Sequence, residues 1–368
     1  MTNERAAPPT ISEVALEAGV GRSTAARTLG GYGYVSPELR ERVLAAAERI
    51  GYRANAVARS MSTGVTHTIG VIVADIANPF FGGVVRGISD ASRRRGFDTL
   101  VLSTYEDLAE EVAATDVLID KRVDGMIIAS AAIEAASAEH ILQARSRGIP
   151  VILVDRVVPG LHLDAVVIDN RTASREAVSR LIAAGHRRIG FVWGPPLAER
   201  PRRRRDFVDV AAGNLSTDGD RLHGYLDALD DEGIAFDPEL VMVGAKNEAR
   251  AESEVARMLA LSDAPTAMFC TETDAVTGAL RAIRAAGRSV GRDVSLIGFD
   301  DSSWAAVMQP PLTMIEQPML ALGERAAEAL LRMIDGEVGS VHVHTLDTRL
   351  IERASVTPPA ASVAARDL

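Results

Sequence analysis

Strand-like and helix-like segments alternate along most of this chain, from Thr68 to about residue 315. The first apolar run, residues 69–74, has the continuous hydrophobicity of a buried strand, and Asn78-Pro79 then begin a segment with helical spacing of apolar residues. Further strands are predicted at residues 99–102, 125–128, 151–154, 165–168, 189–193, 294–298 and 312–315, and near residues 241 and 268. Because repeated strand-helix units form parallel sheets with helices on both faces, the sequence predicts an α/β fold.

The alternation restarts at about residue 165. Two such sets predict two doubly wound parallel-sheet lobes with a ligand site between them, because ligands of these sheets bind beyond the carboxyl ends of the strands. The stretch from Pro195 to Arg221, which contains Arg202-Arg203-Arg204-Arg205, is predicted to be a mobile, solvated loop. Alternatively, this loop could act as a gate over the ligand site or make a second contact with phosphate.

The first fifty residues show only helical patterns. Thr10 and Glu13 form a capping-box pair at the start of one helix, and glycines at positions 19 and 21 break it. A short polar helix follows at residues 22–29, in the order of a helix-turn-helix. Ser36-Pro37 provide an N-cap and a first-turn proline for a third helix, which ends before Gly51. The sequence therefore predicts a small all-α head.

This N-terminal stretch resembles the head and hinge of the lactose-repressor/galactose-repressor (LacI/GalR) family of bacterial transcription regulators. The matching runs are TISEVALEAGVGRSTAARTL and YVSPELRERVLAAAERIGYRANAVARSMSTG. The resemblance implies that the second helix lies in the major groove of DNA and that a hinge helix inserts an apolar wedge into the minor groove. The usual wedge is leucine, and this chain has Met61 there. A capped helix followed by a second helix also occurs in proteins that do not bind DNA. The interpretation as a DNA-binding head therefore depends largely on the match to the hinge.

The resemblance also assigns site residues. The DNA-binding positions are Thr10, Arg22, Ser23, Thr24, Arg27, Tyr34, Ser36, Asn55, Arg59 and Met61. The lobes are similar to periplasmic sugar-binding proteins, in which polar groups after successive strands accept hydrogen bonds from hydroxyls and aromatic faces cover a sugar ring. The effector-binding positions are Asp75, Asn78, Phe80, Phe81, Asp155, Arg156, Arg221, Glu272, Asp300 and Gln317.

Glu272 departs from the family pattern, in which a polar residue followed by aspartate comes after this strand. The chain has Cys270-Thr271-Glu272-Thr273-Asp274 instead, so that without a gap Glu272 takes the polar ligand position. A carboxylate there would favour a ligand with an extra hydrogen-bond donor or a positive charge. The identity of the effector therefore stays open.

Several of these residues also have structural interpretations. Asn78-Pro79 could form only a turn, and Phe80-Phe81 could be only core. Asp155-Arg156 could be a surface ion pair, and Asp300-Asp301 could cap the short helix that contains Trp304. His186 is expected to stabilise a turn rather than bind metal, because no second ligand lies at suitable spacing. The joint placement of polar groups after successive strands favours a site.

Composition limits the alternatives. The 368-residue chain is long enough for two or three domains, and no apolar run approaches the roughly 18 residues of a membrane span, so a cytoplasmic protein without membrane contact is expected. Cys270 is the only cysteine, and no metal or cofactor is predicted. The net charge of −10 is uneven: residues 1–64 carry +2, from eight arginines and six acidic residues, and the remainder carries −12. Phosphate attraction is therefore weak and confined to the head.

The combined prediction is a non-enzymatic, DNA-binding regulator with five segments. These are a head at residues 1–53, a hinge at 54–65, a lobe at 66–165 with 299–320, a lobe at 166–298 with 321–358, and a disordered tail at 359–368. A homodimer should read two-fold operator DNA, and a sugar or related metabolite between the lobes should control it. A repressor released by its effector is favoured, and the alternatives are a ligand-activated DNA binder or a sugar-active enzyme fused to a DNA-binding head. A tetramer stays open, although the tail lacks heptad leucines.

Overall fold

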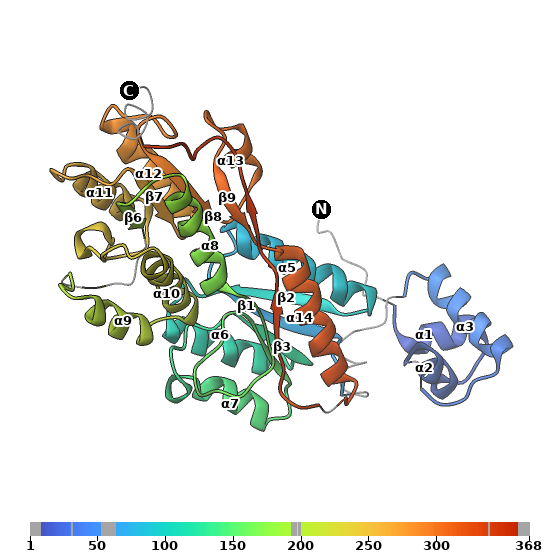
Figure 1. Ribbon diagram of the computed structural model, residues 1–368. Helices are drawn as coiled ribbons and strands as arrows, with labels where there is room; N and C mark the ends of the chain where they lie inside the picture. Colours follow the sequence, from blue (N-terminus) through green and yellow to red (C-terminus); the bar gives the residue numbers. More distant parts are fainter. Residues whose placement is uncertain are drawn as a thin grey trace, which may run out of the picture. The chain divides into compact units, whose positions relative to one another are not determined.

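The computed structural model describes residues 9–30, 32–52, 64–192, 197, 200–337 and 339–359. The chain forms two compact units, Met1–His67 and Thr68–Leu368, which we call the head and the body (Figure 1). None of the helices within the described ranges has the length and apolar character that crossing a membrane requires.

The head contains three helices around a small core. They are α1 (Ile11–Ala18), α2 (Arg22–Gly30) and α3 (Pro37–Arg49). The predicted capping box is confirmed, because the Thr10 hydroxyl accepts from the Glu13 amide and the Glu13 carboxylate accepts from the Thr10 amide at 2.6 Å. Ser36 is the N-cap residue of α3, but its side chain makes no capping hydrogen bond. Arg42 of α3 donates to the Ala18 carbonyl at 2.7 Å, which satisfies the end of α1 and fixes the two helices together.

The first lobe of the body is built on a six-stranded parallel sheet in the order β10-β5-β4-β3-β1-β2. Its strands are β1 (Thr68–Val73), β2 (Asp98–Ser103), β3 (Gly125–Ile128), β4 (Val151–Asp155), β5 (Ala165–Ile168) and β10 (Val343–Leu346). Helices α5 (Pro79–Arg94) and α14 (Met319–Ile334) cover one face, while α6 (Leu108–Asp120) and α7 (Glu139–Ser146) cover the other. A short 3-10 helix, Ala135–Ser137, precedes α7.

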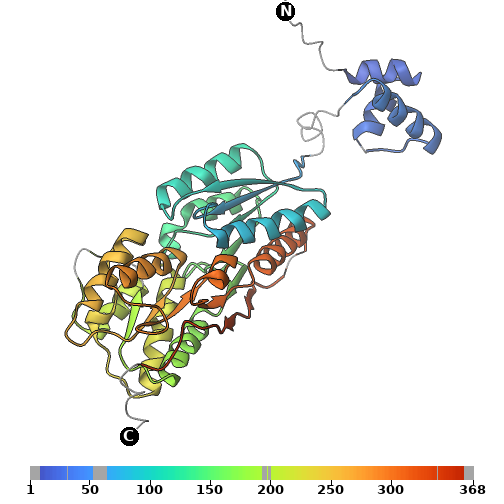
Figure 2. The same cartoon turned by 90° about the horizontal axis from the view of Figure 1, so that it is seen from above.

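Helices α5 and α14 lie side by side although more than two hundred residues separate them (Figures 1 and 2). Their backbones approach closely at two glycines: a Cβ at Gly87 would collide with the Leu320 carbonyl oxygen, and one at Gly323 with the Val84 carbonyl oxygen. The late segment α14 is therefore an integral part of the first lobe.

The second lobe is built on a five-stranded sheet in the order β11-β9-β8-β7-β6, in which only β11 runs antiparallel. Its strands are β6 (Ile189–Val192), β7 (Ala267–Cys270), β8 (Ser295–Phe299), β9 (Thr313–Glu316) and β11 (Arg349–Ile351). Helices α8 (Asn170–Ala183) and α10 (Ser216–Asp231) cover one face, and α11 (Glu248–Leu259) and α12 (Thr273–Ala285) cover the other. The shorter helices are α9 (Arg204–Ala212), α13 (Ser303–Val307) and the 3-10 turn Pro238–Leu240.

The sheets correct the lobe boundaries drawn from the sequence. Strands β5 and β10 belong to the first sheet, β9 belongs to the second, and α14 packs on the first. The chain therefore passes between the lobes three times: after β5, after β9 and between β10 and β11. Hydrophobic periodicity could not show this, because it identifies a buried strand but not the sheet that the strand joins.

The predicted mobile loop between Pro195 and Arg221 is also corrected. Helix α9 occupies its middle and buries Phe207, whose ring lies edge to face with Phe236 at 5.4 Å. Arg204, from the arginine run, forms a two-point ion pair with Asp230 of α10, with one contact at 2.6 Å. The last two arginines of the run, Arg204 and Arg205, are thus the first residues of a packed helix.

Candidate functional site

Two aspartates lie at the ends of central strands, one in each sheet, and both have a strained backbone conformation. Asp155 ends β4 of the first sheet with φ 72°, and Asp300 follows β8 of the second sheet with φ 68°. Both side chains are buried, at 5% and 7% exposure. Positive φ is uncommon outside glycine, and such residues cluster at functional sites.

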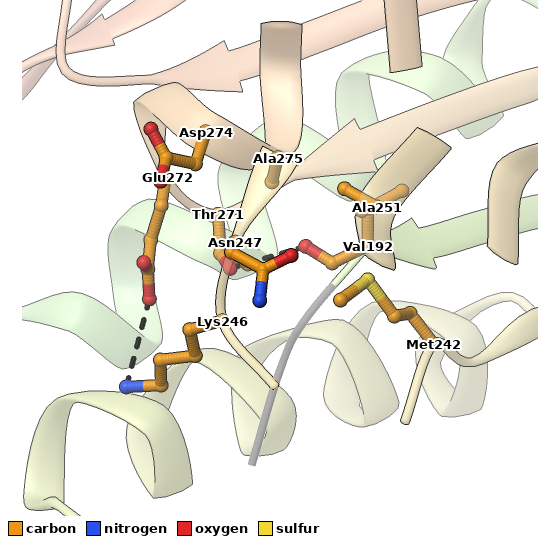
Figure 3. A pocket seen from close by; sticks show the side chains of 9 residues that line it. All are labelled: Val192, Met242, Lys246, Asn247, Ala251, Thr271, Glu272, Asp274 and Ala275. Atoms are coloured by element: carbon orange, nitrogen blue, oxygen red, sulfur yellow. Dashed lines mark hydrogen bonds and ion pairs between the residues drawn. The ribbon is translucent and has the colours of Figure 1, made fainter. Parts of the chain in front are cut away.

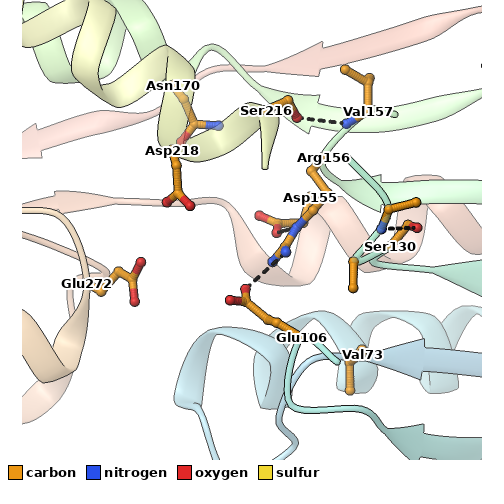
Figure 4. A network of polar contacts seen from close by, with 12 residues as sticks. Val73, Glu106, Ser130, Asp155, Arg156, Val157, Asn170, Ser216, Asp218 and Glu272 are labelled. Carbon is orange, nitrogen blue, oxygen red and sulfur yellow. Dashed lines mark hydrogen bonds and ion pairs between the residues drawn. The ribbon is translucent and has the colours of Figure 1, made fainter. Parts of the chain in front are cut away.

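Arg156 connects the first lobe's polar groups (Figure 4). Its Nε donates to Asp155 at 2.8 Å, and its Nη1 donates to Glu106, in the loop after β2, at 3.0 Å. Burial alone would lower the pKa of Arg156, but the charges of Asp155 and Glu106 outweigh it and raise the pKa. The surface ion pair considered for Asp155 and Arg156 is wrong, because both side chains are buried.

Arg221 has the corresponding place in the second lobe. It donates to the Asn170 side chain at 2.9 Å and to the Thr271 carbonyl at 2.8 Å, and its guanidinium lies 4.1 Å from the centre of the Phe299 ring. Next to Phe299, Asp300 accepts from the Gln317 amide at 2.6 Å. Burial raises the pKa of Asp300, while Arg221 lowers it and Asp155 from the first lobe raises it. The charge of Asp155 in the first lobe therefore acts on Asp300 in the second.

Sequence reasoning missed three charged groups of this region, Lys246, Glu106 and Asp218. The Lys246 Nζ lies 2.6 Å from Asp218 of α10, 3.5 Å from Glu106 and 3.6 Å from Glu272. It thus links the second lobe to the first. The available signal was rarity, since Lys246 is one of only two lysines in the chain, but arginine-rich composition explained that equally well. Asp218 had no signal, because it lies in a helix.

These groups form what we call the interlobe site: Glu106, Asp155, Arg156, Asp218, Arg221, Lys246, Glu272, Asp300 and Gln317. A hydrogen bond from the Val157 amide to Ser216 Oγ, at 3.2 Å, joins the lobes beside it (Figure 4). Burial alone would raise the pKa of Glu106, but Arg156 and Lys246 lower it to about 2. Burial raises the pKa of Glu272 to about 7, with Asp218 and Glu106 adding to the effect and Lys246 and Arg221 opposing it.

A hollow adjoins this site at the carboxyl ends of β6 and β7 (Figure 3). Glu272 and Lys246 belong to both the hollow and the interlobe site. The hollow is lined by Val192, Met242, Lys246, Asn247, Ala251, Thr271, Glu272, Asp274 and Ala275. It is lined by both polar and apolar side chains and lies at the edge where ligands of parallel sheets bind.

Four predicted effector residues lie outside these contacts. The Asn78 side chain caps α5 by accepting from the Phe80 amide at 3.0 Å, and Asp75 accepts from the Ala77 amide at 2.8 Å. Phe80 and Phe81 are each 4% exposed, lie in the core of the first lobe and contact each other edge to face at 4.9 Å. A role in ligand binding stays a prediction for all four.

Two other interpretations are settled by contacts. Asp301 does not cap α13; it forms a two-point ion pair with Arg353, with both contacts at 2.7 Å, and Ser302 is the N-cap residue. His186 contacts Thr266, Ser295 and the Thr357 carbonyl at 2.8–2.9 Å, so it connects strand starts to the C-terminal segment. Burial lowers its pKa. Within the described ranges, no three His, Cys, Asp or Glu side chains are placed to hold a metal ion.

In the head, the exposed face of α2 carries the predicted DNA-reading side chains. Arg22 and Ser23 are exposed and Thr24 and Arg27 half-buried, while Ala25 packs in the core. Tyr34 is 84% exposed in the loop before α3. Asn55, Arg59 and Met61 lie outside the described residues. Helix α2 thus packs on the core of the head through Ala25 and Thr28 and keeps Arg22 and Ser23 on its outer face.

A helix-turn-helix head followed by two parallel-sheet lobes is the plan of a DNA-binding transcription regulator. Residues 10–55 match the family described as bacterial regulatory proteins, lacI family, and residues 66–354 match periplasmic binding proteins and sugar binding domain of LacI family. This chain belongs to the LacI family of bacterial regulatory proteins.

Individual relatives agree with this assignment over nearly the full length. The chain is 35% identical to the HTH-type transcriptional regulator CelR of Thermobifida fusca, covering 96% of this chain and 99% of that protein. It is 32% identical to the HTH-type transcriptional repressor CytR of Escherichia coli (strain K12), with 94% and 96% covered. Among solved structures, the lac repressor dimer bound to operator and the anti-inducer ONPF is similar with a TM-score of 0.80 at 26% identity, covering 95% and 100%. The CelR-cellobiose complex has a TM-score of 0.68 at 30% identity, covering 94% and 99%.

Proposed function

We propose that this protein is a homodimeric repressor whose affinity for operator DNA is set by a small polyhydroxylated ligand bound at the interlobe site. The observation that carries this proposal is that Asp155 and Asp300 both have positive φ at the ends of strands in different sheets and are both buried. Asp155 accepts from Arg156, Asp300 accepts from Gln317, and the charges of Arg221 and Asp155 act on Asp300. A relative in complex with cellobiose supports a sugar or sugar derivative.

The proposed mechanism depends on contacts that cross the lobes. Glu106 of the first lobe contacts Lys246 of the second, and the Val157 amide donates to Ser216. A ligand that rearranges these contacts changes how the lobes close, and this shifts the population away from the DNA-competent state. A coupling of about 1–3 kcal/mol would change operator affinity roughly 5- to 150-fold. The protein would act by binding alone, without catalysis.

The DNA contacts and segment boundaries are part of the proposal. We assign base reading to Arg22 and Arg27, with Ser23 and Thr24 as further contacts, because arginine offers two donors to guanine. Two heads related by dimer symmetry would read a two-fold operator. Residues 1–53 serve as the head, 54–65 as the hinge and 359–368 as the tail. A protein that reads chromosomal operators works in the cytoplasm.

The test of DNA reading is fluorescence anisotropy with DNA fragments from the genes flanking its own. Arg27→Ala should lose about 1–3 kcal/mol of discrimination for the operator fragment over unrelated DNA. Arg49→Ala is the matched control, because Arg49 lies in the same head but is paired with Glu17 at 3.0 Å. Equal operator affinity for Arg27→Ala and wild type would mean that the recognition helix is misassigned.

The effector part is tested by screening sugars, polyols and sugar acids for a rise in melting temperature, since a ligand of the native state must stabilise it. Asp300→Asn should bind operator but lose the response to any ligand found. The direction of the response distinguishes a repressor released by its ligand from a ligand-activated DNA binder.

A further inference from the structure

Among the residues that the structure describes, Glu272 is the carboxylate of the interlobe site without a partner at hydrogen-bond distance. Lys246 Nζ lies 2.6 Å from Asp218 but 3.6 Å from Glu272, which is beyond hydrogen-bond distance. Glu272 is the N-cap residue of α12, yet its side chain makes no capping bond. Its side chain is 31% exposed, against 1% for Asp218. The Glu272 carboxylate therefore faces the hollow and is accessible to a ligand (Figure 3).

The interlobe site also carries more negative than positive groups. Among the residues that the structure describes, it has two more carboxylates than cations. The carboxylates are Glu106, Asp155, Asp218, Glu272 and Asp300, and the cations are Arg156, Arg221 and Lys246. Asp274 lines the same hollow, and burial, Glu248 and Asp75 raise its pKa. No described cation lies within 4.0 Å of Asp75 or Asp274.

A second, separate observation indicates a missing donor. Gln317 is 4% exposed, and its amide nitrogen donates to Asp300 at 2.6 Å. Its Oε1 atom is buried and has no hydrogen-bond partner in the described part of the chain. A buried acceptor without a donor costs about 1–3 kcal/mol, so this atom is expected to accept from a bound ligand.

We propose that the effector is a protonated amine on a polyhydroxylated frame, as in an amino sugar, and that its ammonium pairs with Glu272 at the edge of the hollow. This inference rests on the proposed function, in which a ligand at the interlobe site controls DNA binding. An ammonium brings three donors and one positive charge, and so matches both the excess of carboxylates and the excess of acceptor atoms. The ligand hydroxyls would donate to Asp300 and to Gln317 Oε1.

A neutral sugar fits the same site less well. Its hydroxyls can donate to carboxylates, but they leave the charge excess unchanged, and closing the lobes over an unpaired carboxylate is costly. Lys246 does not remove this excess, because it already pairs with Asp218. The charge of the ligand is therefore expected to decide its affinity.

The test is isothermal titration calorimetry and thermal shift on the full-length protein. The probes are glucosamine, galactosamine and the disaccharide of glucosamine, each beside its N-acetyl derivative and the parent neutral sugar. At least one amine should bind and raise the melting temperature, and its N-acetyl and neutral counterparts should bind at least about tenfold more weakly, as expected when one partner of a desolvated charge pair is removed.

Glu272→Gln should weaken binding of that amine by about tenfold or more and leave its neutral counterpart unaffected. Glu239→Gln is the control, because Glu239 lies in the same lobe but is paired with Arg257 at 2.8 Å and does not line the hollow.

A third readout is the release of protons on ligand binding near pH 7, measured from binding enthalpies in two buffers. The charged groups that face Glu272, and so affect its ionisation, are Asp218 and Arg221 of α10, Lys246 from the loop before α11, and Glu106 from the loop after β2. Pairing with a cation ionises it, so wild type should release protons and Glu272→Gln should not.

The outcomes of these experiments distinguish a failure of the charged-effector inference from a failure of the proposed regulatory function. Neutral sugars that bind as tightly as their amines, or no binding by any amine, would overturn the charged effector while a ligand-controlled regulator stands. Unchanged amine binding in Glu272→Gln would overturn the assignment to this residue. A protein that binds no operator fragment would instead contradict the proposed function itself.

Discussion

Glu106 and Glu272 approach the same lysine from opposite lobes, and their pKa values move in opposite directions. Their side chains are almost equally exposed, at 33% and 31%. Glu106 has Arg156 at 3.0 Å in addition to Lys246, and its pKa falls to about 2. The nearest cation of Glu272 among the described residues is Lys246, at 3.6 Å; burial and the like charges of Asp218 and Glu106 outweigh Lys246 and Arg221, and the pKa of Glu272 rises to about 7. Close cations, and not exposure, decide which carboxylate of this site stays ionised.

Among the variants of these charged groups, Arg156→Ala in the first lobe is expected to have the largest effect on stability. This change leaves buried Asp155 without its partner and removes the closest cation from Glu106. Breaking a buried ion pair on one side costs about 3–5 kcal/mol, so we expect a loss of unfolding free energy of that size. Urea denaturation measures it. A loss below about 1 kcal/mol would mean that Asp155 is solvated or neutral without Arg156.

Lys246→Met removes the cation that the two glutamates share. Asp218 would lose a 2.6 Å contact in a buried position, while Glu106 keeps Arg156. We expect a smaller loss of unfolding free energy, about 2 kcal/mol, because buried Asp218 loses its lysine partner. The pKa of Glu272 should rise further, because its nearest opposing charge is gone. Urea denaturation at several pH values tests both effects, and a variant as stable as wild type at every pH would contradict the assigned role of Lys246.

Glu272→Gln tests the difference between the two glutamates through the pH dependence of the unfolding free energy. The folded pKa of Glu272, about 7, lies above the ordinary value of 4.5, so the folded state binds more protons than the unfolded state between these values. Glu272 therefore stabilises wild type at pH 4.5, and this contribution disappears as the pH rises through 7. The variant should lack this component, of roughly 1–2 kcal/mol. Glu106→Gln is the matched variant, and should change the slope only below pH 4.5, where protonation of Glu106 destabilises wild type.

The smallest effect is expected outside the site, at Arg171→Ala. Arg171 and Asp227 form a two-point pair at 2.6 and 2.9 Å, closer than the contact between Lys246 and Glu272. The Arg171 side chain is 54% exposed, so its loss should cost less than about 1 kcal/mol. Urea denaturation of Arg171→Ala and Arg156→Ala under the same conditions compares the two losses of unfolding free energy. A similar cost for both variants would show that burial contributes nothing to the Arg156 pairs.

The fold was predictable where the signal is local. Strands β3 and β5 have the bounds that the apolar pattern predicts, and the capping box of Thr10 and Glu13 is present. Helix α9 was missed because four arginines dominate its beginning, although Phe207 and Ala211 lie four residues apart on its buried face. Lobe membership was wrong for the segments that cross between the sheets.

The site was predictable where polar residues follow strands. Asp155, Asp300 and Gln317 are such residues, and the structure brings them close together with Arg156 and Arg221. The same rule would have found Glu106, which follows β2 by three residues. Asp218 and Lys246 lie in a helix and in an irregular loop, where linear spacing gives no information about charge partners.

The sequence by itself determined the helices of the head, most strands of the body and the residue types at the strand ends, because caps and hydrophobic periodicity act over a few neighbouring residues. The tertiary structure decided which sheet each strand joins, since the chain crosses between the lobes three times. It also decided which carboxylates are ionised. Those pKa values depend on distances of 2.6–3.6 Å between residues of separate elements and, for Lys246 and Glu106, of separate lobes, and only folding sets such distances.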